Sequence, residues 1–184
     1  MNELEREKKK GLSLPYLVKL IFMRKKIGKK YQTPGFGLAA QLFSTMAKHV
    51  LQRLGPEEGE KLIRAAVEEF GRERGRRIAE NVRAQGKPLS LRNWLIYTDI
   101  SPENFKARPS FPEGDLEACV GACTFINGAR AWGMVDFARL YCKYVDYAIL
   151  AGYNPDVTLV LRDRHATGRD ECVFRYIMKE ENKK

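Results

Sequence analysis

The chain has 184 residues, of which 44% are hydrophobic and 10% aromatic, so it can bury a core and global disorder is excluded. Its formal net charge of +10 would suit a nucleic-acid-binding protein, but residues 1–31 hold ten Lys or Arg and three Glu, a net of +7. The remaining residues carry only +3, without the basic stripe that DNA-binding or RNA-binding domains normally show, so we expect no nucleic-acid partner.

Residues 1–31 are predicted to form a basic amphipathic arm that precedes a single domain, 32–184. One helical face of the arm is apolar and lysines lie opposite it; the apolar residues are Leu17, Leu20, Ile21 and Ile27. We favour packing of this face on the domain, or on a second copy in a homodimer, over the alternative of attachment to an anionic membrane surface.

Residues 12–23 are the most apolar part of the arm, but they resemble neither a signal peptide nor a membrane span. They contain Pro15 and Lys19 and run into Arg24-Lys25-Lys26 instead of a cleavage motif. The four cysteines do not form the dense framework of a secreted scaffold. We therefore expect a reduced, cytoplasmic protein.

Two long helices are predicted next. Residues 38–54 are apolar on one side and end at Gly55-Pro56, a strong helix stop; the apolar residues are Leu42, Met46, Val50 and Leu54. The second helix should run from Pro56 to about residue 83, with a buried stripe of Ile63, Val67, Phe70, Ile78 and Val82. Gly71 and Gly75 lie four apart on one face, which predicts close approach of another backbone.

The middle of the chain has fewer periodic signals. Residues 89–100 suit either a short helix or a strand, and residues 101–115, with three prolines, predict a long loop. Residues 116–126 are predicted to form a buried strand, and Asn127-Gly128 a turn.

A long helix over about 131–151 should follow, and then two strands, 157–161 and 171–178, joined by a hairpin turn. The order predicts an α+β fold in which long helices cover one face of an antiparallel sheet.

Cys142 and Asp146 are the first candidates for chemistry. At four residues apart they would share one side of the expected 131–151 helix, with Asp146 at the edge of an apolar stripe. A carboxylate there needs a partner, which can be a backbone N–H, an arginine, a metal or a ligand. One interpretation is a structural Asp satisfied by the 153–155 loop. The functional one is a general base beside a thiol.

The remaining cysteines suggest a second hypothesis. Cys119 and Cys123 would share a strand face and could converge with Cys142 and Cys172 on a zinc ion. The spacing matches zinc knuckles poorly, and buried cysteines commonly pack as small hydrophobes. We favour packing over zinc and expect neither a metal nor another cofactor.

Arg162 and Arg164 are predicted to lie on the same strand face, just before His165 in the hairpin turn. Their planar forks of donors could bind a substrate carboxylate. The alternative is a charged sheet edge that prevents pairing with another chain.

Three short motifs resemble the L-2-amino-thiazoline-4-carboxylic acid hydrolase family. They are Tyr141-Cys142 with Asp146, then Gly152-Tyr153-Asn154-Pro155, and then Gly168-x-x-x-Cys172-x-Phe174. The end of the hairpin is also similar to ligand-binding domains of the 4-vinyl reductase type, which are α+β units. The resemblance covers about residues 36–178.

This resemblance implies a hydrolase that opens a cyclic C=N substrate, of the amidine or thiazoline kind, to an N-carbamoyl amino acid. Its catalytic candidates are Cys142, Asp146 and Cys123. The resemblance also carries over Cys172, as a substrate-binding candidate. Our interpretation of the residues themselves adds Asn154, Arg162, Arg164 and His165 as further substrate-binding candidates. The alternative is a non-catalytic domain that senses a small molecule, which should have an apolar pocket without a convergent polar cluster. Either way the expected partner is a small molecule.

Overall fold

The structure is a computed structural model that describes Val18, Ile21, Phe22, residues 25–27, 32–112, 115–162 and 171–178. The chain divides into two compact units, Met1–Thr33 and Pro34–Lys184. In the first unit, Val18, Ile21 and Phe22 are helical and exposed. Leu17 and Leu20 of the predicted apolar face lie outside the described residues. No helix within the described ranges is long and apolar enough to cross a bilayer.

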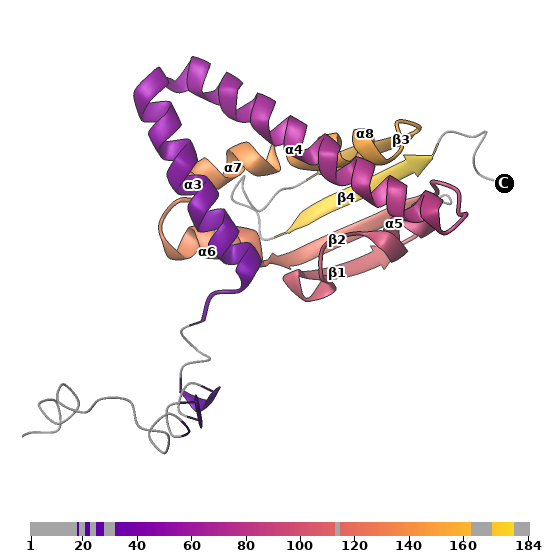
Figure 1. The fold of residues 1–184 in the computed structure, drawn as a ribbon, viewed down its shortest axis with the longest axis horizontal. Helices are drawn as coiled ribbons and strands as arrows, with labels where there is room; N and C mark the ends of the chain where they lie inside the picture. Colours follow the sequence, from indigo (N-terminus) through magenta and orange to yellow (C-terminus); the bar gives the residue numbers. More distant parts are fainter. Residues whose placement is uncertain are drawn as a thin grey trace, which may run out of the picture. The chain divides into compact units, whose positions relative to one another are not determined.

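The second unit contains an antiparallel sheet whose strand order is β1-β2-β4-β3 in the described residues. The strands are β1 (Phe105–Ser110), β2 (Leu116–Cys123), β3 (Val157–Arg162) and β4 (Cys172–Met178). Long helices cover one face of this sheet, which confirms the predicted α+β class (Figure 1).

The helices of this unit are α3 (Gly35–Leu54), α4 (Pro56–Ala84), α5 (Leu91–Tyr97), α6 (Thr124–Ala131), α7 (Val135–Cys142) and α8 (Val145–Tyr153). The stop at Gly55-Pro56 is confirmed: Gly55 has φ 81°, which favours glycine, and Pro56 opens α4. The ambiguous 89–100 segment forms α5, because the Ser90 hydroxyl caps it by accepting from the N–H of Asn93.

The apolar side of α3 is largely turned away from the core. Leu42 and Met46 are 64% and 60% exposed, whereas the buried side carries small or polar residues; these are Gly37, Ala40, Gln41, Ser44 and Ala47. The reason is close packing on α6: a Cβ on Gly128 would lie 2.5 Å from the Cα of Gly37. Leucine or methionine on that side would hold the two helices apart.

The stripe of α4 is confirmed except at one position. Ile63, Val67, Ile78 and Val82 are buried, but Phe70 is 51% exposed, because the residue that meets α8 is its neighbour Gly71. The predicted close approach at the glycines is confirmed. A Cβ on Gly71 would lie 2.6 Å from the Cβ of Ala148, and a Cβ on Gly75 would lie still closer to the backbone of α8.

The long loop predicted over 101–115 is wrong in part, because it contains β1. Among the described strands it pairs only with β2, so it forms the edge of the sheet, where a proline without an N–H is tolerated; here it is Pro109. The sequence Phe-Lys-Ala-Arg-Pro-Ser lacks the apolar alternation of a half-buried strand, since five of its six residues are exposed.

The continuous helix predicted over 131–151 and the turn at Asn127-Gly128 are also wrong. Asn127 and Gly128 lie within α6, which ends before Gly133, where φ is 67°. Between α7 and α8, Lys143 and Tyr144 break the helix, and both bind the carboxylate of Glu60 on α4. Cys142 and Asp146 therefore belong to different helices.

The strands predicted over 157–161 and 171–178 are confirmed as β3 and β4. The strand predicted over 116–126 is shorter, because β2 ends at Cys123 and Thr124 begins α6.

Candidate active site

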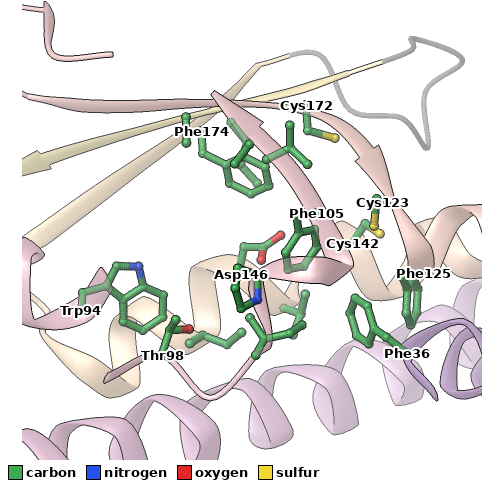
Figure 2. Close-up of a pocket in the computed structure, with 18 of the residues that line it drawn as sticks. Phe36, Trp94, Thr98, Phe105, Cys123, Phe125, Cys142, Asp146, Cys172 and Phe174 are labelled. Carbon is green, nitrogen blue, oxygen red and sulfur yellow. The ribbon is translucent and has the colours of Figure 1, made fainter. Parts of the chain in front are cut away.

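A cavity of about 650 Å³ lies between the helix-covered face of the sheet and the helices above it (Figure 2). Pairing in the sheet selects which residues line it, because residues opposite each other share a face. Ala118 pairs with Phe174, and Val120 pairs with Cys172, and all four line the cavity. Arg74 of α4, Trp94 of α5, Cys142 of α7 and Asp146 of α8 line the other side.

One end of the cavity, here called the thiol end, consists of Phe36, Cys123, Phe125 and Cys142. The Phe36 and Phe125 rings are 5.0 Å apart, and both cysteines pack on the core cluster that contains Phe125 (Figure 2). Burial raises the pKa of the Cys123 thiol, although the N–H groups of Ile126 and Phe125 oppose this. Cys123 is therefore a neutral thiol near pH 7.

The other end, here called the aromatic end, consists of Trp94, Leu161, Phe174 and Tyr176, which pack against one core cluster. The Phe174 and Tyr176 rings stack with an interplanar angle of 11°. Burial raises the pKa of Tyr176, the Asp146 charge adds to this shift, and the nearby Trp94 indole acts against it. This end of the cavity therefore presents mainly ring and aliphatic surface.

Asp146 lies between the two ends, with its carboxylate directed into the cavity (Figure 2). It is the second residue of α8, where the positive end of the helix dipole favours a negative charge. Its negative charge acts at both ends of the cavity. Burial is the larger cause of the raised pKa of Cys123 at the thiol end and of Tyr176 at the aromatic end, and the charge of Asp146 raises both pKa values further. Any cation in the cavity would be drawn to this point.

Arg74 is the other charged residue that lines the described cavity. It donates to Asp99 from Nη2 at 2.6 Å and from Nε at 2.9 Å, and from Nη1 to the Tyr141 hydroxyl at 3.4 Å. Burial acts to lower the pKa of Arg74, but the hydrogen bonds to Asp99 and the charges of Tyr141, Asp99 and Asp146 together outweigh it, and the pKa is raised. Burial raises the pKa of Tyr141 to about 12, so this phenol keeps its proton.

Some of the predicted site residues line the cavity and others do not. Cys123, Cys142, Asp146 and Cys172 all line the cavity. Asn154 is buried at the end of α8, where its amide donates to the carbonyl of Leu89 at 2.7 Å, outside the cavity lining. Arg162 is exposed at the end of β3. Arg164 and His165 lie outside the described residues.

Cys119 faces away from the cavity. Its thiol donates to Glu171 at 2.9 Å on the opposite face of the sheet, where Arg108 also bonds to it. The zinc hypothesis required Cys119 and Cys123 on one face, but the pairing of β1 with β2 shifts register between Phe105 and Ala107, which interrupts the alternation before Cys123. Within the described residues, no three His, Cys, Asp or Glu side chains are placed to hold a metal ion.

The sequence did not identify five polar residues of the cavity: Arg74, Trp94, Thr98, Tyr141 and Tyr176. The alternation of Cys172, Phe174 and Tyr176 in β4 was an available signal for a shared face. Arg74 directly precedes Gly75, which belongs to the buried side of α4. This position was a second available signal, because it indicates that Arg74 is partly buried.

The comparisons with known proteins agree with this fold. The sequence model of the L-2-amino-thiazoline-4-carboxylic acid hydrolase family matches residues 35–176. None of the curated proteins matches the chain. Among solved structures, the chain is similar to subunit 3 of a trafficking protein particle complex from Naegleria fowleri, covalently bound to palmitic acid. The TM-score is 0.50 and the identity 13%, over 79% of this chain and 95% of that one, so the likeness concerns the fold alone.

Proposed function

Because the chain belongs to the L-2-amino-thiazoline-4-carboxylic acid hydrolase family, we propose that it opens a cyclic C=N substrate of the aminothiazoline kind to an N-carbamoyl amino acid. One observation supports this most: Asp146 and the thiols of Cys123 and Cys142 line the same, otherwise largely apolar cavity. A carboxylate in such surroundings binds a protonated amidine more strongly than it would in water.

In the proposed reaction, Asp146 pairs with the protonated amidine and orients a water molecule. The water oxygen bonds to the ring carbon of the C=N group, Asp146 takes one water proton, and the C=N electron pair moves to nitrogen. The ring C–S bond then breaks and its electron pair stays on sulfur. The hydroxyl proton of the intermediate passes to that sulfur as the carbonyl forms, and Asp146 releases its proton to solvent.

Tyr141 is the proposed hydrogen-bond donor for this step. Its pKa of about 12 keeps the phenol neutral, and its hydroxyl lies beside Arg74 at the cavity wall. A fixed donor of this kind stabilises the negative charge that develops on the departing sulfur.

Attack by a thiol is the competing mechanism. Cys142 would bond to the ring carbon, and water would later release the product from that sulfur. Attack by Cys123 is disfavoured because the nucleophilic form of a cysteine is the thiolate, and the pKa of Cys123 is raised. Attack by Cys142 is distinguished from attack by water through the covalent adduct that it would form.

The test is to incubate the protein with 2-amino-thiazoline-4-carboxylic acid and to identify the product by mass and by free thiol. We expect a product heavier than the substrate by one water, and no covalent adduct in the acid-quenched protein. An adduct on Cys142 that Cys142→Ala removes would establish thiol attack. Cys119→Ala is the matched control, because that thiol faces away from the cavity. Failure to open any cyclic amidine would overturn the proposal.

A second candidate is a non-catalytic ligand-binding domain of the 4-vinyl reductase type. The mainly apolar lining of the cavity favours it, and the structurally similar trafficking protein subunit is covalently bound to palmitic acid. Asp146 and Arg74 in the lining weigh against it. Ligand retention without hydrolysis of any cyclic amidine would favour this candidate.

A further inference from the structure

We propose that the substrate is larger and more apolar than an unsubstituted aminothiazoline: it carries an alkyl or aryl body that fills the aromatic end of the cavity. The identity of the amidine head group rests on the proposed function, and the apolar body rests on the observations that follow.

The first observation is size. Cavities of about 300–1,000 Å³ hold drug-sized ligands, and this one measures about 650 Å³. A single five-membered ring with one amino and one carboxyl group would leave most of that volume unfilled. The part of an apolar cavity that a small ligand leaves empty makes no van der Waals contacts with it, so those contacts do not stabilise the complex.

The second observation is the distribution of polar groups. At the aromatic end, Leu161 and Phe174 supply only apolar surface, and Trp94 and Tyr176 supply mainly the surface of their rings. The nearby guanidinium of Arg74 is held in place by Asp99 and Tyr141. The polar groups of this region are single atoms within a mainly apolar surface, so an alkyl or aryl group gains more from burial there than a polar group does.

The third observation is access. Leu95 and Ile96 of α5 line the cavity, yet they are 53% and 60% exposed, so the cavity opens beside α5. Trp94 of the same helix belongs to the aromatic end. An apolar group therefore enters along an apolar rim, while the cationic head reaches Asp146 in the middle of the cavity.

The experiment is calorimetric titration of the full chain with butanamidine, hexanamidine and octanamidine. Burial of one methylene is worth about 0.8 kcal/mol, so we expect affinity to rise about fourfold for each methylene added. Octanamide, which is neutral, should bind more weakly than octanamidine to the wild type. Asp146→Asn should remove that preference while keeping the dependence on chain length.

A variant that fills the aromatic end provides a second measurement. Ala118 pairs with Phe174 and lines the cavity, so Ala118→Phe should weaken octanamidine binding more than butanamidine binding. Ala66→Phe is the control, because Ala66 is exposed on α4.

Affinities that do not change with chain length in the wild type would overturn the inference. A steep dependence on chain length, together with failure to open any cyclic amidine, would overturn the proposed hydrolysis and leave the inferred ligand class supported. The two proposals can thus fail separately.

Discussion

A Cβ built on Gly75 would lie 1.9 Å from the carbonyl oxygen of Ile149, so the backbones of α4 and α8 are in direct contact. Gly152 makes the reciprocal contact, since a Cβ built on it would lie 2.2 Å from the carbonyl oxygen of Arg72. This contact fixes the position of α8, and hence of Asp146, relative to Arg74 on α4. Glycines outside the cavity therefore set how far apart its two charged residues lie.

Gly75→Ala should therefore destabilise the protein by about 2 kcal/mol or more, because overpacking against a rigid backbone outweighs the gain in helix propensity. Chemical denaturation monitored by circular dichroism measures the change. Gly35→Ala is the matched control, since nothing lies within 4 Å of its Cβ position, and it should change stability by less than about 0.5 kcal/mol. Equal effects of the two substitutions would contradict the α4–α8 contact.

The junction of α7 and α8 should make stability depend on acidity. Hydrogen bonds from Lys143, at 2.5 Å, and from Tyr144, at 2.6 Å, hold the pKa of Glu60 below its ordinary value of 4.5. A carboxyl with a lowered folded pKa stabilises the fold above its unfolded pKa, and this contribution is lost as pH falls through the folded pKa.

Wild type should accordingly be more stable than Glu60→Gln at pH 7, by less than about 1 kcal/mol because the pair is partly exposed to solvent. The difference should shrink as the pH is lowered below 4.5 towards the folded pKa of Glu60. Thermal unfolding of both proteins across this range is the measurement. A difference that grows on acidification would contradict the assignment.

The thiol of Cys123 should report the charge of Asp146. Burial and, to a smaller extent, the Asp146 carboxylate raise the pKa of Cys123 above its ordinary value of 9.0, so alkylation should be slow near neutral pH and accelerate above pH 9. Asp146→Asn should shift this profile to lower pH, as measured by peptide mass spectrometry after iodoacetamide treatment.

The control for this experiment is Asp136→Asn, because the Asp136 side chain is 84% exposed on α7. It should leave the alkylation profile of Cys123 unchanged. Identical profiles for wild type and Asp146→Asn would show that the two side chains are not electrostatically coupled.

Local patterns predicted the parts of the fold that depend on local chemistry. The helix stop at Gly55-Pro56 follows from a positive φ and a proline at the first helical position. The contact at Gly71 and Gly75 follows because unfavourable glycines in a helix usually serve close packing. Both depend on residues adjacent in sequence or one turn apart.

The predictions that failed depended on tertiary contacts. The exposed side of α3 is more apolar than its buried side. The buried side carries small residues because Gly128 of α6 packs closely against it. Cys142 and Asp146 were expected to meet through one continuous helix, but they reach the same cavity from α7 and α8. The pairing of Arg74 with Asp99 joins α4 to the segment after α5, and no local pattern indicates it.

The most direct test of the account is the rate of ring opening, as kcat/KM for 2-amino-thiazoline-4-carboxylic acid, in wild type, Asp146→Asn and the control Asp136→Asn. Loss of a general base typically lowers the rate by about a hundredfold or more, so we expect that loss in Asp146→Asn and none in the control. Both variants should keep the circular dichroism spectrum and unfolding midpoint of the wild type. Full activity in a folded Asp146→Asn protein would contradict the central claim that this carboxylate carries the reaction.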